Sequence, residues 1–174
     1  MKKITVVGSG YVGLANATML AKNNEVTILD IDGDRVEKIN NRISPLIDAN
    51  IIDSFEKDKL NLVATTDKRK AYANPDWVII ATPTDYCTET NYFNTRTVED
   101  CIAEAMWNHV DWDNSETHIV IKSTIPIGFV DSLKNDRIFF SPEFLREGTA
   151  LRDCLRPERI VVGNQDQAGV DWVE

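Results

Sequence analysis

The stretch VVGSGYVGLANATMLAKNNEVTILDID, residues 6–32, joins an apolar run, three glycines, a helix-like segment, a second apolar run and an acid. The β-branched residues that precede Gly8 predict a short buried strand, and residues 11–23 have helical spacing without proline. Residues 25–31 predict a second buried strand, with Asp30 near its end. A strand, a glycine turn, a helix and a strand in this order predict the first unit of a parallel sheet.

The rest of the chain continues the alternation of short apolar runs and helical patterns. Further strands are predicted at residues 61–66, 76–82, 118–124, 137–142 and 159–163, and helices at residues 34–43, 50–58 and 97–110. In the first of these helices, Val36, Ile39 and Ile43 should share one face, and the tail after Gly163 could begin another helix. We therefore expect one α/β domain over residues 1–174, a Rossmann-type doubly wound, mainly parallel sheet with helices on both faces.

Composition and charge limit the classes of function. The chain has 174 residues and a net charge of −9, which argues against a nucleic-acid or anionic membrane surface. Residues 4–7 are too short an apolar run for a signal peptide or a membrane span. The three cysteines lack paired or zinc-binding spacing and are typical of reduced thiols, so we expect a cytoplasmic protein without a metal site.

Gly8, Gly10 and Gly13 form the pattern G-x-G-x-x-G between the predicted strand and helix. In a dinucleotide site the first glycine allows a tight turn, the second admits a pyrophosphate, and the third allows close helix packing. Asp30 follows Gly8 by 22 residues, where a carboxylate accepts hydrogen bonds from ribose hydroxyls and repels a 2′-phosphate. The pattern favours NAD over NADP; the alternative is a tight turn with no ligand. The absence of a following Gly-Lys-Ser/Thr excludes an NTPase phosphate loop.

Polar side chains follow three of the other predicted strands. These residues are Thr82 and Thr84, then Lys122, Ser123 and Thr124, and finally Glu143, Arg146 and Glu147. All should lie at the sheet edge where the glycine loop lies, because ligands of such sheets bind beyond the carboxyl ends of the strands. Glu143 and Glu147 are four residues apart and could share a helix face; the alternative for every cluster is a solvated or locally bonded loop.

Five segments together resemble the N-terminal portion of UDP-glucose 6-dehydrogenases, members of the UDP-glucose/GDP-mannose dehydrogenase family. They are GSGYVGL, ATPTDY, NYFNT, KSTIPIGF and FSPEFLREGTALRDCLRPERIVVG, in the expected order over nearly the whole chain. The resemblance implies oxidation of the nucleotide sugar UDP-glucose to UDP-glucuronate with two NAD. GDP-mannose and UDP-N-acetylmannosamine dehydrogenases share the loop but match NYFNT and SPEFLREG less well.

The resemblance also implies roles for individual residues. For NAD binding it implies Gly8, Gly10, Tyr11, Val12, Gly13, Asp30, Arg35, Thr84, Thr124 and Glu147. For catalysis it implies Thr124, Glu143 and Glu147, with Thr124 and Glu143 positioning water and protons and Glu143 as the general base. For the sugar nucleotide it implies Glu143, Phe144, Leu145, Arg146 and Glu147, mainly through their backbone.

The chain departs from the family pattern at Cys87, Asn94 and Cys154. The family's nucleophilic cysteine lies in a Gly-x-Cys-x-Pro-Lys-Asp segment, and a lysine and an asparagine lie on a long central helix. Both are expected beyond residue 174, together with the substrate domain, so we expect this chain to be inactive alone. Cys101 should face the core, whereas Cys87 and Cys154 should lie in loops. A non-catalytic NAD-binding module and half of a related nucleotide-sugar dehydrogenase remain alternatives.

Two tryptophans bear on association. Trp107 and Trp112 fall on or near predicted polar faces, and a missing half would leave apolar surface exposed. A homo-oligomer is one expectation from such a surface, and aggregation is the other.

Overall fold

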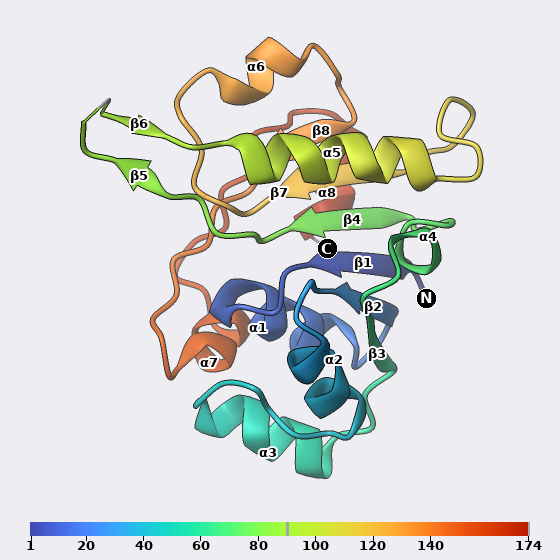
Figure 1. Cartoon of the computed structure of the whole chain (residues 1–174), viewed down its shortest axis with the longest axis vertical. Helices are drawn as coiled ribbons and strands as arrows, with labels where there is room; N and C mark the ends of the chain where they lie inside the picture. Colours follow the sequence, from blue (N-terminus) through green and yellow to red (C-terminus); the bar gives the residue numbers. More distant parts are fainter. Residues whose placement is uncertain (90, 174) are drawn as a thin grey trace.

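A six-stranded parallel sheet forms the centre of the molecule (Figure 1). The computed structural model describes residues 1–89 and 91–173. Across the sheet the strands are β3 (Leu62–Thr65), β2 (Glu25–Leu29), β1 (Lys3–Val7), β4 (Trp77–Ile80), β7 (His118–Ile121) and β8 (Ile138–Phe140). All neighbouring strands are parallel, which confirms the predicted doubly wound α/β class.

The strand order reverses direction beside β1. The chain moves outward from β1 through β2 to β3 and then returns to the opposite side of β1 as β4. The connections that leave β1 and β4 therefore diverge at the carboxyl ends of two adjacent strands. In open α/β sheets this point forms the crevice in which ligands bind.

One face of the sheet is covered by α1 (Tyr11–Leu20), α3 (Ala49–Lys57) and α7 (Ala150–Leu155). Leu14 and Ala17 of α1 are fully buried, because small and branched residues on this helix let it pack closely on β1. The last helix, α8 (Gln167–Val173), packs on the same cluster through Trp172, so the predicted final helix is confirmed.

The opposite face is covered by α4 (Lys68–Ala71), α5 (Arg96–Asn108) and α6 (Phe129–Leu133). Within α5, Val98, Ile102 and Ala105 are buried at the predicted helical spacing. Cys101 and Met106 are partly buried against the same cluster, and His109 ends the helix as its C-cap. Apolar layers on both faces explain why the central strands consist of continuous apolar runs.

The α2 helix (Gly33–Asn40) lies against the edge strand β3 and covers its polar backbone. The Asn40 side chain donates to Ala64 O (2.9 Å) and accepts from Ala64 N (2.8 Å), as a neighbouring strand would. The prediction that Ile43 continues the apolar face of this helix is wrong. The helix ends at Asn40, Arg42 has a φ of 58°, and the Ile43 side chain is exposed.

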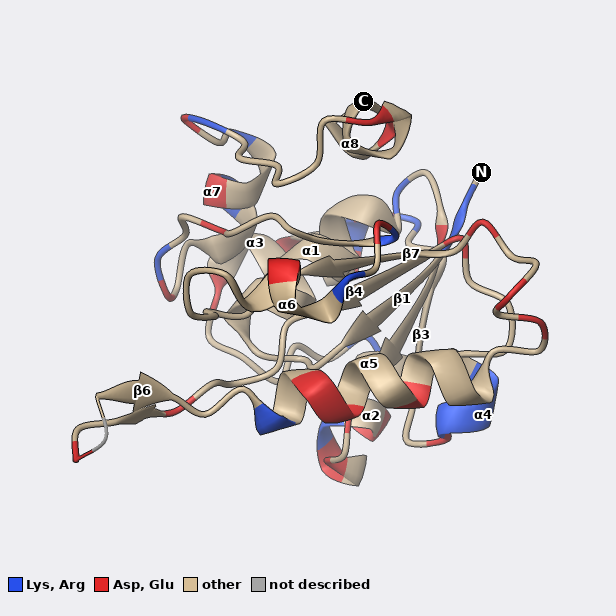
Figure 2. Ribbon diagram, turned by 90° about the horizontal axis from the view of Figure 1, so that it is seen from above, with Lys and Arg blue, Asp and Glu red and all other residues tan. Residues whose placement is uncertain are grey.

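A two-stranded hairpin, β5 (Tyr86–Cys87) and β6 (Tyr92–Phe93), extends away from the body of the molecule (Figure 2). Its strands are too short for a period-two pattern, so the sequence did not predict them. The rings of Tyr86 and Phe93 pack edge to face with centroids 5.0 Å apart. Cys87 therefore lies in a short exposed strand rather than in a loop.

The prediction of a strand at residues 159–163 is wrong. Gly163 N donates to Phe140 O (2.8 Å), but Ile160 and Val161 are exposed and lie outside any strand. The adjacent strand β8 is the edge strand of the sheet and has only three residues, so it offers few backbone groups to a further strand.

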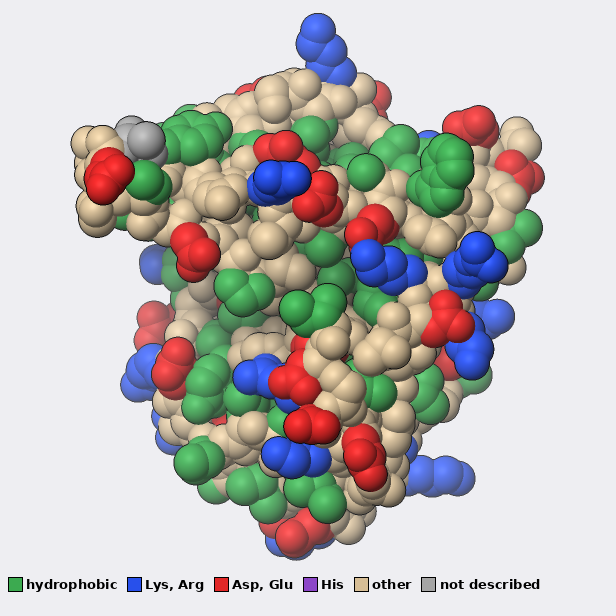
Figure 3. Space-filling view, viewed as in Figure 1, with side chains coloured by type: hydrophobic (Ala, Val, Ile, Leu, Met, Phe, Trp, Pro, Cys, Tyr) green, Lys and Arg blue, Asp and Glu red, His purple; other side chains and the backbone are tan. Residues whose placement is uncertain are grey.

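Trp112 corrects a further expectation, because it is buried and the Arg137 guanidinium lies 4.1 Å from its ring centroid. Trp107 is 88% exposed, as its position on a polar face predicted. Acidic and basic side chains are interspersed over the face drawn in Figure 3. Within residues 1–89 and 91–173, no helix has the length and apolar character needed to cross a membrane.

Candidate functional site

The three motif glycines serve different purposes in the turn between β1 and α1. Gly8 has a φ of +94°, which L side chains rarely adopt, and a Cβ there would lie 2.9 Å from Ala81 O. A Cβ on Gly13 would lie only 1.9 Å from Gly8 O, so this glycine permits the close approach of helix and strand. A Cβ on Gly10 would meet no heavy atom within 4 Å. Neither packing nor a positive φ accounts for Gly10. The open space beside it would let a ligand approach the protein backbone closely.

Within residues 1–89 and 91–173, the start of α1 beside this open space has no side-chain cap. Gly10 is the N-cap, no side chain caps the helix, and its first turn contains no acid. The first N–H groups of a helix have no intrahelical acceptor and carry a partial positive charge. A ten-residue helix that begins this way, behind a glycine with room beside it, suits a pyrophosphate. Tyr11, Val12 and Gly13, the predicted phosphate-binding residues, form its first turn.

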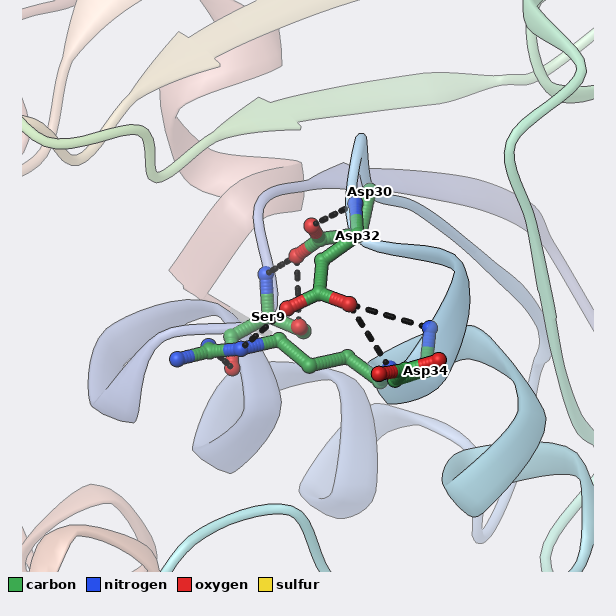
Figure 4. A network of polar contacts seen from close by, with 5 residues as sticks. Ser9, Asp30, Asp32 and Asp34 are labelled. Atoms are coloured by element: carbon green, nitrogen blue, oxygen red, sulfur yellow. Dashed lines mark hydrogen bonds and ion pairs between the residues drawn. The ribbon is translucent and has the colours of Figure 1, made fainter.

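Asp30 follows β2 and is held against the glycine loop (Figure 4). Its Oδ2 accepts hydrogen bonds from Ser9 N (2.7 Å) and Ser9 Oγ (2.5 Å), and its Oδ1 accepts one from Asp32 N (2.9 Å). Arg35 lies beside it and donates from Nη1 to Ser9 O (3.2 Å). The structure thus brings the predicted ribose-binding pair to the glycine loop, and it adds Ser9 and Asp32, which the motif did not single out.

The loop after β4 contacts the loop after β7. Ser123 Oγ donates to Thr82 O (2.7 Å) across these two strand ends. Thr82 Oγ1 is buried and has no hydrogen-bond partner in the described part of the chain. Such an unpaired buried hydroxyl is uncommon in a folded protein. Thr84 is half-buried and Thr124 is exposed.

A buried ion pair joins the ends of β7 and β8. Lys122 Nζ lies 2.6 Å from Glu143 Oε1, and the two side chains are 5% and 15% exposed. Lys122 also lies 5.1 Å from the ring centroid of Trp172, whose Nε1 donates to Ser141 Oγ (3.1 Å). The expectation that Glu143 shares a helix face with Glu147 is wrong, because residues 141–149 are not helical. Glu143 pairs instead with a lysine 21 residues earlier.

The segment that carries Glu143 and Glu147 is fixed by Asp153 of α7. Arg146 Nε and Nη2 donate to the two Asp153 carboxylate oxygens (3.0 and 2.8 Å), and Arg146 N donates to the same group (3.1 Å). These bonds lower the pKa of Asp153 below its usual range. The Arg146 side chain therefore orders its own loop. Phe144 and Glu147 are exposed, and Leu145 is half-buried.

A cavity of about 540 Å³ lies on the face of the sheet that carries α1 and α8. Ile4, Trp77 and Trp172 supply apolar lining, and Lys122 and Glu143 supply charged lining. Among the described residues, neither the glycine loop nor Asp30 lines this cavity. The candidate site therefore has two parts, the open space beside the glycine loop and the cavity beside the ion pair.

Of the cysteines, Cys154 lines the cavity beside Lys122 and Glu143, whereas Cys101 packs on the opposite face of the sheet. Burial raises the pKa of the Cys101 thiol and of the Cys154 thiol to about 12. Cys154 lies in α7, with its Sγ 3.8 Å from Met19 Sδ, so its predicted place in a loop is wrong. Neither of these two thiols is a poised thiolate.

The diverging loops at β1 and β4, the open glycine turn and the anchored acid after β2 define a dinucleotide-binding domain of the Rossmann type. Comparison with known proteins specifies it further. The chain belongs to the UDP-glucose/GDP-mannose dehydrogenase family, whose NAD-binding domain matches residues 2–174.

Individual relatives agree with this membership. The chain is 44% identical over 173 residues to the UDP-glucose 6-dehydrogenase of Campylobacter jejuni and 47% identical over 165 residues to that of Streptococcus pneumoniae. These matches include 96% and 92% of this chain but only 43% and 41% of the relatives. A ternary complex of GDP-mannose dehydrogenase from Pseudomonas aeruginosa superposes with a TM-score of 0.85 at 26% identity, over 100% of this chain and 43% of that one.

Proposed function

We propose that this chain is the NAD-binding part of an enzyme that oxidises UDP-glucose to UDP-glucuronate with two NAD⁺. The observation that carries the proposal is the open space beside Gly10 at the uncapped start of α1, next to the anchored Asp30. Relatives at 44% and 47% identity are UDP-glucose 6-dehydrogenases, whereas the GDP-mannose dehydrogenase is 26% identical. The higher identities support UDP-glucose as the substrate.

The proposed binding roles follow the two parts of the site. The first-turn N–H groups of α1 hold the pyrophosphate, and Asp30 and Arg35 hold the adenosine ribose. Thr84, Thr124 and Glu147 line the half of the cleft near the reactive end of the cofactor. The backbone of residues 143–147 contacts the sugar nucleotide, in a conformation that the Arg146–Asp153 contacts maintain.

The proposed chemistry assigns Glu143 and Thr124 to water and proton handling. When bound, NAD⁺ supplies a hydride acceptor. Glu143 serves as general base, and Lys122, 2.6 Å away, fixes the orientation of its carboxylate. The second oxidation requires a thiolate to capture the aldehyde, and burial raises the pKa of Cys101 and Cys154 too far for that role. We propose that another part of a full-length enzyme supplies it.

Cofactor binding by residues 1–174 tests the proposal directly. Titration followed by NADH fluorescence should give a tighter Kd for NADH than for NADPH, because the Asp30 carboxylate repels a 2′-phosphate. Asp30→Ala should weaken NADH binding by about 1–3 kcal/mol through the loss of charge-assisted hydrogen bonds. Asp53→Asn, which removes a charge from the exposed side of α3, is the control and should bind as the parent does. Equal affinity of the parent for NADH and NADPH would overturn the assignment of Asp30.

A further inference from the structure

Arg35 lies at the ribose end of the site, where an arginine side chain could bind a phosphate group. In dinucleotide-binding domains, an arginine near this position accommodates the 2′-phosphate of NADP. Its guanidinium is planar, permanently charged and suited to phosphate oxygens. The presence of Arg35 beside Asp30 therefore raises the question of what prevents it from taking a phosphate.

The guanidinium is already engaged by two groups of the protein, which belong to Ser9 and Asp32 (both labelled in Figure 4). Arg35 Nη1 donates to the carbonyl oxygen of Ser9 (3.2 Å), and Arg35 Nε lies 3.4 Å from Asp32 Oδ2. Ser9 is 1% exposed and its hydroxyl is bound to Asp30, so the carbonyl that receives Arg35 belongs to an immobilised part of the loop. The Ser9 contact places the guanidinium beside the glycine loop, and the Asp32 contact, between side chains that are 37% and 47% exposed, orients it from the start of α2.

Asp32 divides its two carboxylate oxygens between two tasks. Oδ1 caps α2 by accepting from Asp34 N (3.0 Å) and Arg35 N (3.2 Å). Oδ2 is the oxygen that faces Arg35 Nε. A neutral amide at this position retains the capping oxygen but loses the charge that attracts the guanidinium, so the two tasks can be separated by one substitution.

We propose that Asp32 is a specificity-determining residue: its carboxylate orients and partly neutralises the Arg35 guanidinium, so that Arg35 can contact the uncharged ribose hydroxyls but attracts a 2′-phosphate less strongly. The proposal rests on the proposed function, because it concerns the same NAD cleft. This effect adds to the repulsion by Asp30. Asp30 repels the phosphate, and Asp32 pairs with the Arg35 guanidinium that would attract it. Discrimination against NADP is then shared between Asp30 and the Asp32–Arg35 pair.

The experiment compares Kd for NADH and for NADPH in residues 1–174 and in Asp32→Asn, by fluorescence titration at low salt. The ratio of the NADPH Kd to the NADH Kd should fall by about three- to tenfold in Asp32→Asn, the scale of one charge-assisted contact to phosphate. Circular dichroism should show unchanged helix content, because asparagine caps helices as well as aspartate does.

Two further variants separate this mechanism from a general loss of negative charge. Asp34→Asn removes an acid from the same helix start, and among the described residues its carboxylate forms no ion pair, so the ratio should stay at the parent value. In Asp32→Asn/Arg35→Gln the gain should disappear, because the guanidinium is absent. An equal gain in Asp34→Asn, or a gain that survives Arg35→Gln, would overturn the proposal.

NADH binding by the parent chain distinguishes a failure of the proposed function from a failure of this inference alone. A parent that binds no NADH would overturn the proposed function and this inference with it. A parent that binds NADH but whose ratio is unchanged by Asp32→Asn would overturn this inference alone.

Discussion

Adding a side chain at Gly10 should affect NADH binding, whereas adding one at Gly13 should affect the stability of the fold. Gly10→Val should abolish NADH binding and leave the fold intact, because the added carbons occupy the open space beside the turn. Gly13→Ala should destabilise the fold, because its Cβ would lie 1.9 Å from Gly8 O. The pair distinguishes a glycine that a ligand requires from one that packing requires.

The structure sets the size of each effect on stability. In Gly13→Ala, helix and strand must separate until the new contact reaches an ordinary length, and overpacking of this kind costs about 1–3 kcal/mol. For a domain of this size that cost corresponds to a fall in Tm of roughly 2–12 °C. Gly10 has φ −70° and ψ −177°, which valine can adopt, so Gly10→Val should lose only about 1 kcal/mol as a poorer N-cap.

Thermal melting followed by circular dichroism, with an NADH titration on the same samples, measures both effects. Normal NADH binding by Gly10→Val would refute the reasoning, since the glycines would then form only a turn. A parent-like Tm for Gly13→Ala would show that the close approach of α1 to the loop is not required.

Three further predictions concern the ion pair, the thiols and turnover. Lys122→Ala should lower the free energy of unfolding, measured in urea, by about 3–5 kcal/mol, because Glu143 is left buried without its partner. Lys57→Ala, which breaks an exposed ion pair, is the control and should have little effect. Equal losses of stability in the two variants would contradict the importance of the Lys122–Glu143 pair. Thiol labelling at pH 8 should modify Cys101 and Cys154 far more slowly in the native chain than in the urea-unfolded chain, because burial raises the pKa of both thiols to about 12. Equal labelling rates in the two states would contradict the burial of these thiols. Residues 1–174 with UDP-glucose and NAD⁺ should give no sustained increase in NADH absorbance, and steady turnover would show that the required nucleophile is within this chain.

Several features of the site were predictable because they depend on short-range pattern. The strand before Gly8, the helix after it and the acid at position 30 follow from residue type and spacing within one βαβ unit. Asp32 could also have been predicted, since an acid immediately before a helix is a common N-cap signal. Its contact with Arg35 was not, because an N-cap pattern does not specify where the second carboxylate oxygen points.

Errors arose where the outcome depends on a partner far away in the sequence. The β-branched run at residues 159–163 has strand propensity, but the edge strand beside it, β8, has only three residues, and Ile160 and Val161 are exposed. Ile43 fits a helical period, but the chain turns at Arg42, whose guanidinium donates to Leu60 O and Leu62 O (3.0 Å each). Tertiary contacts override local preference in both cases.

By itself, the sequence determined the α/β class, the glycine loop and the position of the acid after the second strand, because each depends on neighbours a few residues apart. Only the tertiary structure decided which side chains meet across the strand ends. Lys122 pairs with Glu143 because β7 and β8 are adjacent and parallel, which brings residues 21 positions apart to within 2.6 Å. Spacing along the chain carries no information about such a contact, since side-chain direction and burial are fixed only when the strands pack into one sheet.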